Sequence, residues 1–421
     1  MSDAPRLVFA NANLLDGEHE ARPRQTVVVE GERIVSVGDA PYTAAPGDRV
    51  VDLAGRTLMP GLVTTHFHST YHDIGISPQP LGLEAPPAVL AIVAEKNLQC
   101  ALRSGFTSVV SAGGINAFID PQLKRAITDG LTEGPRMVAG GHGLDIVGGY
   151  QDTGKWWWEL GNQGSCRYAN GPDGFRHLVR DEVRRGVEMV KLFPSGGHGV
   201  HEEVETLTFT RDELRAAVHA AHQRGARVRA HCPWKEPMLE CLAAGVDVID
   251  HGDRIDAEVL DAMLAADATL VPSAYFIHLM LNDPTNAVGA TPVQMAPVRA
   301  DFENMCKRLP EANAAGLRIT VGDDYGILLL PHRPHIYARE LAFYVDHVGI
   351  PALDVLRWAT KHGGELMLED VGTIATGKLA DLLVVDGDPS RDIALLQDDA
   401  KLLAIVKGGE FVKDALAGER G

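Results

Sequence analysis

The stretch from residue 58 to residue 69, LMPGLVTTHFHS, is a short apolar run that ends in two histidines, His66 and His68. Residues i and i+2 of a β-strand face the same side, so both imidazoles are expected to point into one space. An H-x-H triplet alone is weak evidence for a site, because this chain has 17 histidines. Its position at the end of the first strand of the central region makes it informative.

The central region, residues 59–368, alternates short apolar runs with amphipathic segments. The clearest predicted helix lies between Thr210, which forms a capping box with Glu213, and Gly225. The runs predicted to be strands end at His68, Ser111, Gly140, Pro194, His231, His251, Ser273 and Asp324. Eight strands, each followed by a helix, predict an α/β fold of the (β/α)8 TIM-barrel type. A doubly wound open sheet gives a similar pattern, but no GxGxxG follows the first strand.

The two ends of the chain, residues 1–58 and 369–421, read as short strands joined by tight turns. Gly31 separates two alternating runs near the N-terminus, and a Gly-Gly pair at 408–409 has the same place near the C-terminus. The economical interpretation is one small β-sandwich domain formed from both chain termini. The barrel domain, residues 59–368, is then inserted between them.

Further strand ends of the central region carry polar groups. Lys191 lies on an apolar run, while His231, His251 and Asp324 end three later runs. In a barrel all of them would emerge at one rim, where the active sites of this fold lie. Imidazole and carboxylate together suit borderline divalent metals such as zinc. Lys191 needs an explanation there, because a buried ammonium is costly unless it is neutralised or paired.

The chain has 39 Lys and Arg against 57 Asp and Glu, so its formal net charge is −18, and 45% of it is hydrophobic. This is the composition of an ordinary globular protein, and the acidic balance argues against nucleic acid or an anionic membrane as a partner. The N-terminus lacks a signal-peptide pattern, and no apolar run approaches the length of a membrane span. Five cysteines without CxxC spacing favour free thiols. We therefore expect a cytoplasmic protein.

The order of these groups, from HxH through the lysine and two histidines to the aspartate, resembles the metal-dependent amidohydrolase superfamily. Its prolidase-like and imidazolonepropionase-like branch is the most similar. The supporting stretches are GFTSVVSAGG (105–114), GPRMVAGG (134–141), KLFPSGG (191–197) and GTIATGKLADLLVVDGDP (372–389). Together they cover nearly the whole chain, both ends included.

The resemblance implies a binuclear centre of two divalent metal ions, with zinc as the first choice. It assigns His66, His68 and Asp324 to the more buried metal, and His231 and His251 to the exposed one. Lys191 would be carboxylated by carbon dioxide, and its carbamate would bridge the two metals. A metal-bridging hydroxide would then attack the scissile carbonyl, with Asp324 acting first as base and then as acid.

The chain departs from the family pattern at several places. Tyr150 stands where many relatives have a histidine near the substrate carbonyl; it could donate a hydrogen bond to the oxyanion or could only pack. His142, eight residues earlier, is a second candidate for substrate binding. Cys232-Pro233 follows the strand-five histidine, so a tyrosine that binds carboxylates in relatives is missing. Asp323 replaces a hydroxyl residue, and we expect it to support the ligands or to face solvent.

The interval from residue 144 to residue 171 is longer than an ordinary βα loop and is a candidate lid. It contains Trp156, Trp157 and Trp158, which could line the substrate pocket, contact a second subunit or simply pack. His335 is a further candidate for substrate contact by its alignment with relatives. His198 and His201 are expected to be solvated loop residues.

The predicted function is hydrolysis of an amide-type C–N bond in a small molecule with a hydrophobic or aromatic group. N-acyl amino acids, aryl amides and dipeptides all fit. Within the superfamily, the alternatives are a cyclic-amide hydrolase and a mononuclear deaminase, although Lys191 counts against the deaminase. An alternative of another class is a barrel scaffold without catalysis. The oligomeric state, including a homo-oligomer, stays open.

Overall fold

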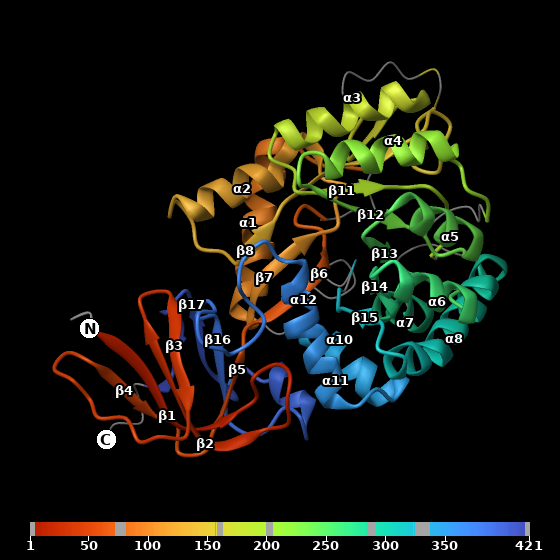
Figure 1. Ribbon diagram of the computed structural model, residues 1–421. Helices are drawn as coiled ribbons and strands as arrows, with labels where there is room; N and C mark the ends of the chain where they lie inside the picture. The colour runs from red at the N-terminus through yellow and green to blue at the C-terminus, as the bar shows by residue number, and fades with distance from the viewer. Residues whose placement is uncertain are drawn as a thin grey trace.

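The computed structural model describes residues 5–71, 81–155, 157, 163–198, 205–283, 291–322, 324 and 337–416. Strands from both ends of the chain share one eight-stranded sheet, and the barrel lies beside it (Figure 1). The strands of this terminal sheet are β1 (Arg6–Leu14), β2 (Arg22–Glu30), β3 (Arg33–Gly38), β4 (Arg49–Asp52), β5 (Thr57–Pro60), β16 (Leu382–Val385), β17 (Leu402–Lys407) and β18 (Glu410–Asp414).

The strand order in the terminal sheet is β18-β17-β16-β5-β1-β2-β3, with β4 also paired to β1. The two chain ends join where β16 pairs antiparallel with β5, Leu383 opposite Met59. Both predicted hairpins are confirmed: Gly31, at φ 57°, separates β2 from β3, and the 408–409 pair separates β17 from β18. The apolar faces of these strands bury one hydrophobic cluster that includes Phe9 and Val27 from the N-terminal part of the chain and Leu382 from the C-terminal part.

The central region forms two runs of parallel strands, β6-β7-β8 and β10-β9-β11-β12-β13-β14-β15. Their bounds are β6 (Leu62–Phe67), β7 (Phe106–Ser111), β8 (Arg136–Val138), β9 (Gly140–Asp145), β10 (Cys166–Tyr168), β11 (Met189–Leu192), β12 (Arg227–His231), β13 (Val248–Asp250), β14 (Thr269–Val271) and β15 (Arg318–Ile319). The barrel closes where the backbone N–H of Thr65 donates to the carbonyl of Val321 over 2.8 Å. The hydroxyls of Thr65 and Thr320 also hydrogen-bond over 2.7 Å.

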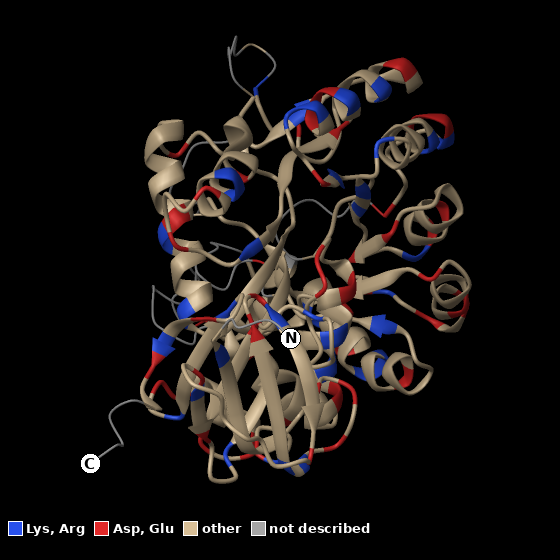
Figure 2. Cartoon of the chain, turned by 60° about the vertical axis from the view of Figure 1, so that its left-hand side comes forward, with Lys and Arg blue, Asp and Glu red and all other residues tan. Residues whose placement is uncertain are grey.

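Helices surround these parallel strands (Figure 1). They are α1 (Pro87–Arg103), α2 (Ile119–Thr128), α3 (Gly171–Arg184), α4 (Arg211–His222), α5 (Lys235–Ala244), α6 (Ala257–Ala265), α7 (Ala274–Asn282), α8 (Pro292–Ala314), α10 (Ala338–Phe343), α11 (Ala352–Arg357) and α12 (Gly363–Leu366), with short turns of other helix types at η1 (Asn116–Phe118), η2 (Tyr344–Val348), η3 (Trp358–His362) and η4 (Ile393–Gln397). Figure 2 shows charged residues of both signs along the helices, whereas most residues of the strands are uncharged.

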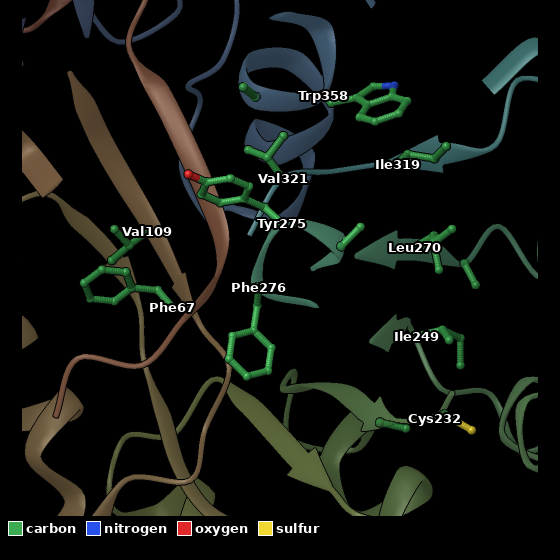
Figure 3. Close-up of a cluster of buried hydrophobic side chains, with 14 of the residues drawn as sticks. Phe67, Val109, Cys232, Ile249, Leu270, Tyr275, Phe276, Ile319, Val321 and Trp358 are labelled. Carbon is green, nitrogen blue, oxygen red and sulfur yellow. The ribbon is translucent and has the colours of Figure 1, made fainter. Parts of the chain in front are cut away.

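The barrel strands read as continuous apolar runs because both of their faces are covered, which is typical of parallel sheets. Every residue of β13 and β14 is buried. Ile249, Leu270 and Ile319, on three successive strands, belong to one hydrophobic cluster with Trp358 (Figure 3). The predicted (β/α)8 barrel with a β-domain from both termini is therefore confirmed.

The interval 144–171 differs from the predicted loop, because β10 lies inside it and pairs parallel with β9. In the described part of the chain, no helix has both the length and the apolar character needed to span a bilayer. All five cysteines are described and none forms a disulfide, as predicted.

Thr210 caps α4 as predicted, because its hydroxyl accepts the backbone N–H of Glu213 while the Glu213 carboxylate accepts the backbone N–H of Thr210. Losing such a cap costs about 1 kcal/mol. We therefore expect Thr210→Ala to lower the midpoint of thermal unfolding. Thr128→Ala is the matched control, since the Thr128 hydroxyl only donates to a carbonyl one turn earlier in an exposed helix end. Equal midpoints for the two variants would contradict the role of the cap.

Candidate metal centre

The first barrel strand places two imidazoles beside the carboxylate that follows the last strand. His66 lies on β6, and His68 follows the end of that strand. The Asp324 carboxylate lies 3.0 Å from Nε2 of His68 and 3.4 Å from Nε2 of His66. Asp324 reaches this position because its backbone N–H donates to the carbonyl of His66, which brings the two strand ends together.

His251 completes a group of donors that could hold one metal ion. In the described residues, ligand atoms of His66, His251 and Asp324 all lie within 4.8 Å of one another, and all three side chains are buried. His251 follows β13 directly and has a left-handed backbone, with φ 74°. Two histidines and one carboxylate form a donor set that suits zinc and similar divalent ions.

Lys191 and His231 line one cavity together with these donors. The ring of His231 lies 4.5 Å from that of His251, and Phe193 and Tyr150 pack near it, at 5.5 and 5.3 Å between centroids. The described residues that line the cavity are His66, His68, Tyr71, Tyr150, Gln151, Lys191, Phe193, His198, His231, His251 and Asp324. All six residues predicted as metal ligands therefore face one cavity.

The electrostatics of the cavity fit a metal centre. Burial lowers the pKa of His66 to about 4 and lowers the pKa of His231 and His251 well below the usual range. These imidazoles are therefore neutral at pH 7, which is the form that binds metal. Burial alone would raise the pKa of Asp324, but His66 and His68 lower it, so Asp324 is ionised.

Two residues that sequence analysis missed hold this arrangement in place. Arg229 on β12 and Asp250 on β13 form a fully buried ion pair. Arg229 also donates to the carbonyls of Thr65 and Ser111, over 2.6 and 3.0 Å, and Asp250 lies 3.3 Å from Nδ1 of His66. The signal that could have revealed them is a charged residue within a short buried strand: Arg229 lies between Val228 and Ala230, and Asp250 ends β13 after Ile249.

Lys191 has a partner that sequence analysis did not foresee. Its Nζ donates to Asp250 over 2.5 Å, and both side chains are buried. Burial lowers the pKa of Lys191, while Arg229 and Lys191 hold the pKa of Asp250 well below its usual range against the effect of burial. A buried lysine at this place is therefore compensated by a carboxylate in the unmodified chain.

His198 differs from the expectation that it is solvated. Its side chain is 2% exposed, its ring stacks on His251 at 3.7 Å, and its Nδ1 lies 2.9 Å from the Asp253 carboxylate. The strand-end turn after β11, with φ 58° at His198, directs the ring inward. His198 is therefore a further polar group of the cavity wall.

The residues predicted to contact substrate are divided between cavity and periphery. Tyr150 lines the cavity, as does Gln151, which was not predicted, whereas His142 packs against Phe118 and lies 3.1 Å from Glu182. Trp157 is 59% exposed. The remaining predicted residues lie outside the described residues: Trp156, Trp158, Asp323, His335 and His201.

Comparison with known proteins finds a family model that matches most of the chain. Residues 57–412 match a model described as "Amidohydrolase family". The chain is 25% identical over 440 residues to ochratoxinase of Aspergillus niger, across 98% of this chain and 88% of the relative. It is also 25% identical over 426 residues to imidazolonepropionase of Mycolicibacterium smegmatis, across 92% and 90%.

A solved structure gives the same picture for the fold. The crystal structure of a prolidase complexed with N-methylphosphonate-L-proline matches with a TM-score of 0.84 at 28% identity, and the match covers 97% of this chain and 100% of the other. The barrel and the terminal sheet are therefore shared over almost the full length.

Glu340 supports the turn that carries Asp324 and gives a pH-dependent prediction. Its buried carboxyl accepts the backbone N–H of Gly322 over 3.0 Å, and burial raises its pKa to about 8 from an ordinary 4.5. The folded state therefore holds a proton that the unfolded chain loses, so stability from this group is lost as pH rises from 4.5 to 8. Glu340→Gln is neutral throughout.

We compare the midpoint of thermal unfolding of Glu340→Gln with that of the original chain at pH 5 and at pH 8. The difference between the two midpoints should shift in favour of the variant by at least about 2 °C when the pH is raised from 5 to 8. Thermal unfolding of both proteins at the two pH values measures this. A difference that does not change with pH would show that Glu340 is ionised in the folded state.

Proposed function

Since the chain belongs to the amidohydrolase family, as its motifs predicted, and is a hydrolase of carbon–nitrogen bonds, we propose that it cleaves an amide-type C–N bond in a small molecule. The observation that carries the proposal is the convergence of neutral imidazoles and an ionised carboxylate in one buried cavity. Among the described residues, Nε2 of His231 and Nδ1 of His251 are buried without a hydrogen-bond partner, and metal binding would use such nitrogens.

We propose a binuclear centre. His66, His68 and Asp324 would hold the inner ion, and His231 and His251 the outer one, with zinc as the first choice. Lys191, carboxylated by carbon dioxide, would join the two, since its lowered pKa favours the neutral amine that reacts with carbon dioxide. When bound, divalent ions acidify water and polarise the scissile carbonyl.

The chain's own residues would then complete the reaction. Asp324 is hydrogen-bonded to His68 at the centre of the cavity, where it can take a proton from the attacking water. It can then pass this proton to the leaving nitrogen. Tyr150 lies beside His231, where its hydroxyl can donate to the oxyanion that develops on the carbonyl.

The cavity wall supports a substrate with a hydrophobic or aromatic group. Tyr71, Phe193 and Tyr150 provide aromatic surface next to the candidate ligands. Similarity to proteins named ochratoxinase and prolidase supports amides such as N-acyl amino acids, aryl amides and dipeptides. A cytoplasmic location agrees with five unpaired cysteines.

A cyclic-amide hydrolase is the second candidate, because the chain aligns with imidazolonepropionase over 92% of its length. A mononuclear deaminase has less support. The lysine on β11 would have no role in a centre with one metal.

A substrate panel on metal-defined protein tests the proposal. The chelated protein should be inactive, and reloading with zinc should restore turnover of at least one N-acyl amino acid, aryl amide or dipeptide. Cyclic amides in the same panel test the second candidate. Full activity with one metal per chain would contradict the binuclear centre, and no turnover with two metals bound would contradict the function.

Lys191→Ala should lower kcat/KM by at least about 100-fold and reduce the metal content, because both ions lose a shared ligand. Short carboxylic acids should restore part of the activity by taking the place of the carbamate. Lys124→Ala is the matched control, since Lys124 forms an ion pair with Glu188 away from the cavity. Full activity in Lys191→Ala would overturn the carbamate.

A further inference from the structure

Asp145 is the last residue of β9, at the rim where the candidate metal ligands emerge, and its side chain is buried. One carboxylate oxygen accepts the backbone N–H of Ile146 over 2.7 Å, and the other accepts that of Gln151 over 2.8 Å. These two amides are the first and last of the segment 146–151. A single carboxylate therefore closes this turn at both ends.

The turn is built closely around that carboxylate. A Cβ at Gly149 would lie 2.2 Å from Oδ1 of Asp145, so only glycine leaves room for the acid. On the other side, the Tyr168 hydroxyl of β10 donates to the carbonyl of Gln151 over 2.7 Å. The extra strand β10 thus braces the same turn.

The turn carries Tyr150 and Gln151 into the candidate metal centre. The ring of Tyr150 lies 5.3 Å from that of His231, at an interplanar angle of 26°, and its hydroxyl donates to the carbonyl of Gly197 over 3.4 Å. Tyr150 belongs to no strand or helix. The position of its ring relative to the candidate ligands therefore depends on the backbone of the turn 146–151.

An acid is a costly way to close this turn. Burial, with a smaller contribution from the nearby Asp152, raises the pKa of Asp145 to about 7, although the two backbone N–H groups lower it. Serine or asparagine, which also accept backbone N–H groups, would close a turn without a buried charge. The cost is understandable if two strong acceptors are needed to hold the turn in one conformation.

We propose that Asp145 is a positioning residue that holds Tyr150 over the metal centre through the turn 146–151. It does not contact the substrate, and its effect on the reaction passes through Tyr150. This inference rests on the proposed function, in which the Tyr150 hydroxyl stabilises the oxyanion.

A double-mutant cycle tests the inference. Tyr150→Phe should lower kcat by about 100-fold, the usual size for one lost oxyanion donor, with little change in KM. Asp145→Ala should lower kcat by about 10-fold or more, and should cause no further loss in the Tyr150→Phe background. Independent, multiplying losses in the double variant would overturn the inference.

Two further variants distinguish a specific effect on Tyr150 from a general loss of folding. Asp145→Asn keeps one acceptor, and Gly149→Ala displaces the carboxylate from the other side, so both should show the same dependence on Tyr150. Asp16→Ala is the matched control: Asp16 also accepts two backbone N–H groups, those of Glu18 and His19, but lies in the connection between β1 and β2. It should lower the unfolding midpoint and leave kcat unchanged.

Hydrogen exchange separates this inference from the proposed function. Asp145→Asn should speed exchange at the amides of residues 146–151 while leaving the rest of the barrel and the zinc content unchanged. This readout needs no substrate, so it holds even if no amide is turned over. Unchanged exchange in this segment would overturn the role of Asp145, whatever the activity.

Discussion

Arg229 and Asp250 lie on neighbouring strands inside the barrel, and water reaches neither side chain. Their pair links three further strands: Arg229 donates to carbonyls on β6 and β7, and Asp250 meets His66 on β6 and Lys191 on β11. A buried ion pair is favourable only when its remaining donors and acceptors are satisfied. Here the remaining groups of the pair are satisfied by β6, which carries His66, and by Lys191. The candidate metal centre and the ion pair therefore depend on each other.

Three residues that line the cavity have a strained backbone. His198, His251 and Asp324 follow three different strands, and each has a positive φ, between 56° and 74°. A residue other than glycine pays about 1 kcal/mol or more for this conformation. At each of the three positions, the turn after the strand directs the side chain into the cavity, where it meets side chains from other strands. At these three positions the strain accompanies a side chain that lines the cavity, as is common at functional sites.

The support around the cavity consists largely of groups that do not themselves touch its centre. Glu340 holds the turn before Asp324, Asp253 orients His198, and Asp145 closes the turn that carries Tyr150. In each case a buried carboxylate fixes a backbone or an imidazole. This arrangement is typical of sites whose ligands must keep one orientation.

The sequence by itself determined the barrel, the composite terminal sheet and the six candidate ligands, because apolar periodicity and strand-end position are local features. It could not reveal Asp250 as the partner of Lys191, because the two residues are 59 positions apart and meet only when β11 and β13 lie in one barrel. The burial of His198 was missed for the same reason: its loop is polar in sequence, and only the stacking on His251 removes it from water. Local pattern fixes which strand ends carry polar groups, whereas pairing and burial between distant segments are decided by the tertiary structure.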